Sequence, residues 1–174
     1  EENAWKNLEA EMLGRSFADV RSEATAVWND LLGRIRVEGG TEREKGLFYS
    51  CLYRSFLWPA LRSDVNGEFT DADGEVVNTG FRYYTGPSYW DDYRNKLILL
   101  GLLAPDVAAD VISSDTDRGE KRGGFMPTFF HGDHASAFVA GVYLRGIRGF
   151  DVRRAYELVL RNATVQGPIR PWLD

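Results

Sequence analysis

Apolar residues recur at helical spacing along most of this chain, and this periodicity restricts it to a mainly α-helical fold. Between Ser16 and Val37, apolar side chains recur three or four residues apart. The segment 42–58 carries a wider apolar stripe, typical of a helix that packs on two sides, as in a bundle or toroid. Strands do not alternate with helices, so a doubly wound parallel sheet is excluded.

Several of the predicted helices have recognisable start and stop signals. Thr41 and Glu44 have the spacing of a capping box, and Pro59 follows the expected end of that helix. The Gly39-Gly40 pair is expected to end the preceding helix. The predicted helices span residues 3–13, 16–37, 42–58, 89–103, 106–113, 133–148 and 152–162.

The segment 66–77 is the one departure from helical patterning. Its Asn-Gly and Asp-Gly dipeptides stand beside short alternating runs, which predicts a small β-hairpin. Asp71 and Asp73 at its tip are acidic, but the glycine offset and the missing terminal Glu do not fit an EF-hand calcium loop. We therefore expect a solvated turn.

Composition excludes several classes of partner. The net charge is −5 and the basic residues are scattered, which does not favour a nucleic-acid partner. No apolar run approaches the roughly 20 residues of a membrane span, so none is predicted. The single cysteine, Cys51, cannot form an internal disulfide; because it lies in an apolar helix, we expect a buried structural thiol.

Two loops combine aromatic, acidic and basic side chains in a way that suits carbohydrate binding. A sugar ring stacks on an aromatic side chain, and its hydroxyls pair with carboxylate and guanidinium groups. The loop at 88–96 offers Trp90, Asp91 and Arg94 as substrate-binding residues. The alternative is that Asp91 and Asp92 merely favour a helix N-terminus, with Trp90 in the core.

The second loop leads into the sequence His131-Gly132-Asp133-His134, which holds both histidines of the chain. Asp133 is a candidate N-cap, and we expect the group to bind sugar hydroxyls or handle protons. The two histidines could ligate a transition metal with Asp133, but an i,i+3 pair that spans a helix start would need a further ligand that the sequence does not indicate, so no metal site is assigned. Arg62, Asp64 and Arg82 also flank the hairpin, and we interpret them as surface charges.

Several motifs resemble the helical catalytic domain of glycoside hydrolase family 92. They include Gly39-Gly40-Thr41-Glu42, Trp90-Asp91 with Tyr93-Arg94, Gly132-Asp133-His134-Ala135 and the Gly-Ile-Arg-Gly-Phe-Asp run that ends at Asp151. The resemblance extends from about Ala4 to Asp174. It implies a calcium-dependent exo-α-mannosidase in which an N-terminal β-sandwich precedes an (α/α)6 toroid.

The resemblance also implies how this chain is organised. Residues 1–38 would be linker helices, and residues 39–174 the incomplete N-terminal portion of the (α/α)6 catalytic domain. We therefore expect a mainly α-helical toroid fragment that leaves apolar faces uncovered, melts weakly and is inactive alone. The remaining toroid and the β-sandwich would complete it. Degradation of N-glycans and a periplasmic or secreted location are further implications.

The mechanism implied by the resemblance is inverting hydrolysis. One carboxylic acid protonates the leaving oxygen, and a carboxylate on the other side activates water. Trp90 and Asp91 would line the mannose subsite, with Arg94 in support. Calcium would assist at the sugar hydroxyls, and most of its ligands, like the general base, would lie beyond Asp174.

One departure from the family pattern concerns the general acid, which is a Glu shortly before the Gly-Asp-His-Ala motif. Residues 123–132 contain neither Glu nor Asp. Either His131 or Asp133 is the catalytic proton donor, or the leaving group is already good, as in a mannosyl phosphodiester. A catalytically inactive mannose-binding module and a zinc hydrolase using His131 and His134 are the remaining alternatives.

Overall fold

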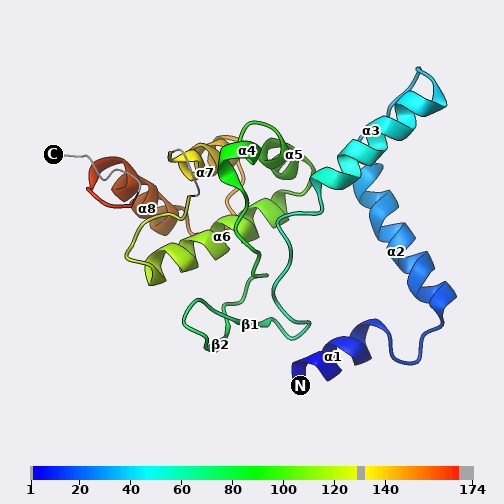
Figure 1. The fold of residues 1–174 in the computed structure, drawn as a ribbon, viewed down its shortest axis with the longest axis horizontal. Helices are drawn as coiled ribbons and strands as arrows, with labels where there is room; N and C mark the ends of the chain where they lie inside the picture. Colours follow the sequence, from blue (N-terminus) through cyan, green and yellow to red (C-terminus); the bar gives the residue numbers. More distant parts are fainter. Residues whose placement is uncertain (1, 129–131, 169–174) are drawn as a thin grey trace.

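Helices dominate the computed structural model, which describes residues 2–128 and 132–168 (Figure 1). The elements are α1 (Glu2–Glu11), α2 (Phe17–Leu32), α3 (Glu42–Ser55), β1 (Glu68–Thr70), β2 (Val76–Asn78), α4 (Tyr89–Asp92), α5 (Lys96–Leu103), α6 (Pro105–Lys121), α7 (His134–Leu144) and α8 (Val152–Thr164). The expected mainly α-helical fold with a small β-hairpin is confirmed. None of the helices in the described ranges is long and apolar enough to cross a bilayer.

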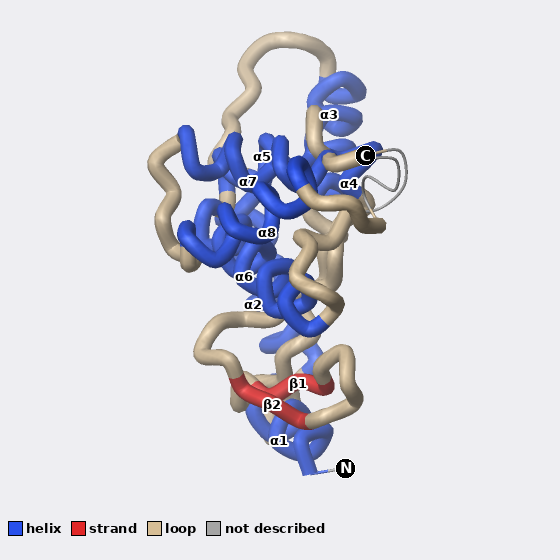
Figure 2. The backbone as a smooth tube through the Cα atoms, turned by 90° about the vertical axis from the view of Figure 1, so that its left-hand side faces the viewer, coloured by secondary structure: helices blue, strands red, loops and turns tan. Residues whose placement is uncertain are grey.

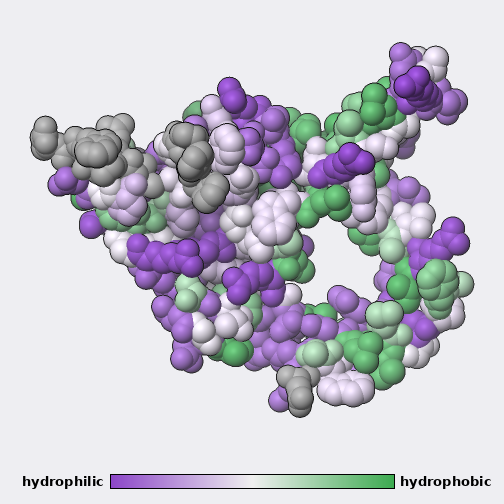
Figure 3. Space-filling model, in the orientation of Figure 1, coloured by the Kyte–Doolittle hydropathy of each residue, from purple (hydrophilic) through white to green (hydrophobic). Residues whose placement is uncertain are grey.

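Helices α1, α2 and α3 form an arm that projects from the rest of the molecule (Figure 1). No residue of α1 or α2 is buried, and α3 buries only Leu52. The arm rejoins the molecule at the hairpin, where the Asn3 amide donates to Asp64 at 3.0 Å and to Glu68 at 2.9 Å. Figure 3 shows an open gap between the arm and the rest, with hydrophobic residues along the arm.

Helices α4 to α8 form the body, and they pack around one hydrophobic cluster. Helix α6 packs against α5, α7 and α8, so it lies at the centre of the body. Figure 2 shows the hairpin beside α1, at the end of the molecule opposite α5 and α7. The largest fully buried apolar side chains of the body are Tyr89, Leu97, Val111, Ile112, Met126 and Val142.

The hairpin has the predicted antiparallel pairing, with Phe69 opposite Val77. The expectation of a solvated acidic turn is wrong for Asp71, which is buried. Its Oδ1 accepts the backbone N–H groups of Asp73 at 2.9 Å and Glu75 at 3.0 Å. Its Oδ2 receives Lys121 Nζ from α6 at 2.8 Å, a tertiary contact that sequence patterning does not reveal.

Three of the helix boundaries that differ from the expected ones are informative. Helix α2 ends at Leu32 rather than at Val37, because Gly33 has low helix propensity and forms the C-cap. The predicted helix at 89–103 is two helices, since the Asn95 side chain accepts the Lys96 N–H and starts α5 afresh. Helix α6 continues past Ser113 to Lys121.

The predicted packing of the third helix on two sides is wrong for the described residues. Helix α2 packs on α3 through Trp28 and Tyr53, whose ring centroids lie 4.5 Å apart. The rest of the stripe is open, and Leu47 is 65% exposed. Cys51 is exposed rather than buried for the same reason: an amphipathic pattern marks a face that can pack, but burial requires a partner.

Candidate functional site

The first turn of α4 carries two of the predicted substrate-binding residues. Tyr89 is 2% exposed and points into the core, whereas Asp91 is exposed and Trp90 is partly exposed. Asp91 and Asp92 lie in the first turn, as predicted, where the helix dipole favours their charge. The buried Tyr89 therefore fixes a short helix whose next two residues reach the surface.

An aromatic stack joins α4 to the start of α7. The rings of Tyr93 and His134 lie 4.5 Å apart at 17°, and the Arg94 guanidinium lies 5.3 Å from the centroid of the Tyr93 ring. Three charged or aromatic side chains from two predicted loops are thus brought together. A planar stack with a guanidinium beside it suits contact with a sugar face and its hydroxyls.

Asp133 has a structural task in the described geometry. As the N-cap of α7 it accepts the Ser136 N–H at 3.3 Å and the Ser136 hydroxyl at 2.5 Å. The Asn162 amide of α8 also donates to it, at 3.1 Å. The carboxylate accepts all three bonds, so its oxygens are engaged by α7 and α8. His131, the other candidate proton donor, lies outside the described residues.

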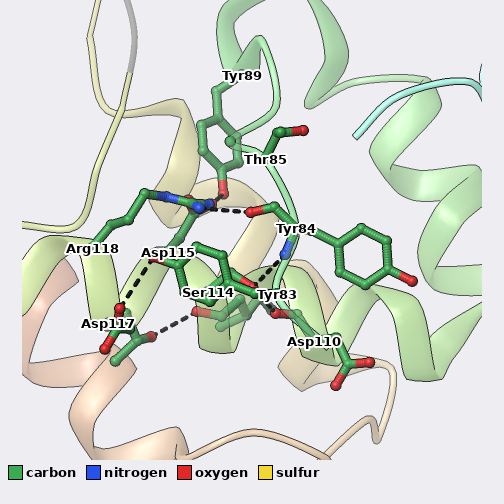
Figure 4. Close-up of polar contacts among 12 residues, drawn as sticks. Tyr83, Tyr84, Thr85, Tyr89, Asp110, Ser114, Asp115, Asp117 and Arg118 are labelled. Atoms are coloured by element: carbon green, nitrogen blue, oxygen red, sulfur yellow. Dashed lines mark hydrogen bonds and ion pairs between the residues drawn. The ribbon is translucent and has the colours of Figure 1, made fainter. Parts of the chain in front are cut away.

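Beneath α4 is a buried polar group that the sequence did not reveal; we call it the anchor cluster. It consists of Tyr89, Asp115, Arg118 and the main-chain carbonyl of Tyr84 (Figure 4). The Tyr89 hydroxyl donates to Asp115 Oδ2, and Arg118 Nη2 donates to Asp115 Oδ1 at 2.5 Å. Arg118 Nη1 also donates to the Tyr84 carbonyl at 2.6 Å.

Burial dominates the protonation equilibria of the anchor cluster. It raises the pKa of Tyr89 well above its usual value, and the negative charge of Asp115 adds to this effect. Burial also raises the pKa of the Asp115 carboxyl, while Arg118 opposes that rise. Tyr89 therefore remains a neutral hydrogen-bond donor, and the anchor cluster is held by a charge-assisted network.

The anchor cluster continues toward the hairpin through charged groups of α6. The Arg118 guanidinium lies 5.0 Å from the centroid of the Tyr83 ring, and the Tyr83 hydroxyl donates to Asp117 at 3.1 Å. Lys121 pairs with Asp117 at 3.2 Å and with Asp71 at 2.8 Å. Burial raises the pKa of Tyr83 to about 12, so it too stays protonated.

The charges that flank the hairpin fix it in place instead of lining the candidate site. Arg82 pairs with Asp110 of α6 at 2.9 Å, and Arg62 donates to the Thr70 carbonyl at 2.9 Å. Asp64 accepts amide groups from α1, including Asn7 at 2.7 Å.

The described residues do not fit a metal centre. Residues 2–128 and 132–168 contain no group of three or more His, Cys, Asp or Glu side chains placed to hold an ion. His134 stacks on Tyr93, and its predicted partner His131 falls outside these ranges. The described part of the chain therefore supplies no cluster of carboxylate, imidazole or thiolate groups for calcium or zinc.

Comparison with known proteins identifies the family. The profile of the glycosyl hydrolase family 92 catalytic domain matches residues 3–173. This chain belongs to glycosyl hydrolase family 92. No curated protein sequence matches it significantly.

Solved structures of the family have the same fold. The family GH92 α-mannosidase BT3965 from Bacteroides thetaiotaomicron is 28% identical, with a TM-score of 0.84, over 90% of this chain. A second structure of BT3965, in complex with mannoimidazole, gives 29% identity and a TM-score of 0.83. The inverting mannosidase BT2199 from the same organism is 26% identical, with a TM-score of 0.79, over 96% of this chain. The match spans 22% of BT3965 and 24% of BT2199, so this chain corresponds to under a quarter of either.

Proposed function

We propose that the protein containing this chain is a glycoside hydrolase that releases terminal α-linked mannose. The observation that carries the proposal is the convergence of α4 and α7. Exposed Asp91 and partly exposed Trp90 lie next to a stacked Tyr93–His134 pair with Arg94 beside it. Membership of family 92, and the mannoimidazole complex of a relative, support mannose as the ligand of these groups.

Each residue has a task that follows from its chemistry. Trp90 offers an aromatic face to the sugar ring, and the Asp91 carboxylate accepts hydrogen bonds from the sugar hydroxyls. Arg94 and His134 supply donors at the edge of the same site. Inversion also needs a carboxylate on the far side of the sugar ring and a water molecule between that carboxylate and the ring. The family resemblance is what supports calcium dependence, a periplasmic or secreted location and N-glycan substrates.

The test is mannose release from an α-mannobioside by the full-length protein. We expect Asp91→Asn and Trp90→Ala each to lower kcat/KM by about 100-fold, because each removes a group that contacts the substrate. Asp106→Asn is the matched control, since Asp106 is an exposed acid in the first turn of α6. Equal activity of all three variants would contradict the assignment.

A mannosyl phosphodiester is the second candidate substrate, and the missing acid favours it. Residues 123–132 contain no carboxylate, and Asp133 is committed to Ser136 and Asn162. Without a general acid, a poor leaving group loses about 10²–10⁴ in rate, whereas a phosphate loses little.

The two substrates can be compared directly, each with calcium and with chelator. Fast phosphodiester cleavage with slow mannobioside turnover would support the phosphodiester. Comparable cleavage would instead support proton donation by His131 or another residue. No cleavage of either, with retained mannose binding, would favour an inactive mannose-binding module.

A further inference from the structure

An open hollow of about 480 Å³ lies beside the anchor cluster, and we call it the arginine hollow. Its polar side comes from Ser88 at the start of α4, from Thr128 before the second candidate loop, and from two arginines of the α6 end. The hollow therefore adjoins both segments that carry the candidate site. Residues that line the hollow include Trp58, Ser88, Asp115, Arg118, Arg122 and Thr128.

The lining carries a net positive charge. Asp115 is the one carboxylate among the lining residues, and it is bound to Arg118 and Tyr89. Arg118 is 8% exposed, and all three of its guanidinium nitrogens are engaged: Nε and Nη2 donate to Asp115, and Nη1 donates to the Tyr84 carbonyl. Arg122 is exposed and has no acidic partner in the described ranges, so its charge is uncompensated.

A neighbouring hollow gives a useful contrast. It is lined by Arg148 and Arg154, but also by Asp117 and Asp151, so its charges balance. In the arginine hollow the second guanidinium has no such counterpart among residues 2–128 and 132–168. The Ser88 hydroxyl makes no side-chain cap at α4, and Trp58 donates its Nε1 proton to the Gly86 carbonyl along the rim. The Thr128 hydroxyl donates to the Gly132 carbonyl at 2.9 Å, so the Ser88 hydroxyl and the Arg122 guanidinium are the donors that this net positive hollow offers to a phosphate group.

We propose that the arginine hollow is an anion subsite that holds the phosphate of a mannosyl phosphodiester, with Arg122 and Ser88 as its direct contacts. This inference rests on the proposed function and specifies its leaving-group side. Water attacks the anomeric carbon, and the bond from that carbon to the phosphate oxygen breaks. The electron pair stays on that oxygen, and the carboxylate that inversion requires on the far side of the ring takes the proton lost by water. Arg118 is a positioning residue: its hydrogen bonds to Asp115 and to the Tyr84 carbonyl hold the buried side of the hollow in place.

The test compares two substrates in the full-length protein. For Arg122→Ala we expect the ratio of kcat/KM for the mannosyl phosphodiester to that for a neutral aryl α-mannoside to fall about 10-fold or more. Arg122→Lys should recover part of the loss, because it keeps the charge but not the planar fork. Arg153→Ala, an exposed arginine of α8 that pairs with Glu157, is the control and should leave the ratio unchanged.

Phosphate binding provides a readout that does not need activity. Titration calorimetry with inorganic phosphate should give a Kd that rises about 10-fold in Arg122→Ala and not in Arg153→Ala, with weaker binding at high salt. If the wild-type protein hydrolyses no mannoside but phosphate binding depends on Arg122, the proposed function fails and the subsite stands. If mannose is released but neither the ratio nor phosphate binding responds to Arg122, the subsite is refuted.

Discussion

Helix α2 of the arm and helix α6 of the body are both amphipathic, yet they differ sharply in burial. Helix α2 has a long amphipathic repeat and a capping box, but none of its residues is buried. Helix α6 is interrupted by polar residues, and nine of its residues are buried. Local sequence therefore decides that both segments are helical, whereas the presence of neighbours decides which of them forms a core.

The same contrast applies to polar groups. In the arm, Ser16 with Asp19 and Thr41 with Glu44 satisfy backbone groups at exposed helix starts. In the body, Asp115 and Arg118 are buried and depend on each other and on distant segments. Substitutions should consequently have local effects in the arm and global effects in the body.

The largest expected effect is that of Asp115→Ala. It leaves Arg118 buried without its counter-charge and should lower the free energy of unfolding by about 3–5 kcal/mol. The paired control in the arm is Asp30→Ala, whose partner Arg34 is exposed, with an expected loss below about 0.5 kcal/mol. Urea unfolding followed by tryptophan fluorescence measures both, and similar losses would contradict the contrast.

Apolar truncation should separate the two regions nearly as strongly. Ile112→Ala removes a side chain that is 0% exposed and should cost about 2–5 kcal/mol. Leu47→Ala in α3, 65% exposed, should change stability by less than about 0.5 kcal/mol. If Leu47→Ala proved as costly as Ile112→Ala, the arm would be packed in solution.

A smaller, pH-dependent effect is expected at the hairpin. The hydrogen bond from Lys121 lowers the pKa of Asp71 from its usual 3.8. The contribution of the Asp71 charge is therefore complete above about pH 3.8 and disappears as the pH falls through the lower folded value.

Asp71→Asn tests this contribution, because the amide oxygen can still accept the turn N–H groups while the charge is lost. The thermal midpoint of the wild type should exceed that of the variant at pH 6, and the difference should shrink as the pH falls below about 3.8. A difference that does not depend on pH would assign the effect to turn geometry instead.

The smallest effect should be local to the arm. Ser16→Ala removes the N-cap of α2 and should destabilise that helix by about 1 kcal/mol. Amide hydrogen exchange should become faster in α2 without a change in α6. Equal acceleration in both helices would mean that the arm and the body unfold as one unit, contrary to the burial pattern.

Much of the fold was predictable from sequence, because its signals are local. The Thr41–Glu44 capping box, the Asp133 N-cap and the hairpin at 66–77 were all predicted and are confirmed. The end of α6 was missed because Ser114 and Thr116 are buried and bond to carbonyls four residues earlier. Polar residues in a buried helix give the pattern of a loop until their partners are known.

The candidate site divides in the same way. Residue type and clustering pointed to Trp90, Asp91, Arg94 and His134, and their roles remain predictions. The anchor cluster went unnoticed, since Tyr89, Asp115 and Arg118 are not contiguous in the sequence. The Asp115–Arg118 pair, three residues apart in α6, was the one available signal, and a charged pair at this spacing is more often exposed.

The sequence by itself determined the helices, their caps, the hairpin and the family, because these depend on short-range periodicity, capping chemistry and recognisable motifs. Only the tertiary structure decided that α6 is central, that Asp71 and Asp115 are buried, and that Arg122 faces an open hollow with no counter-charge among the described residues. The physical reason is that burial and charge compensation are properties of pairs of segments. A linear sequence specifies each partner but not which partners meet.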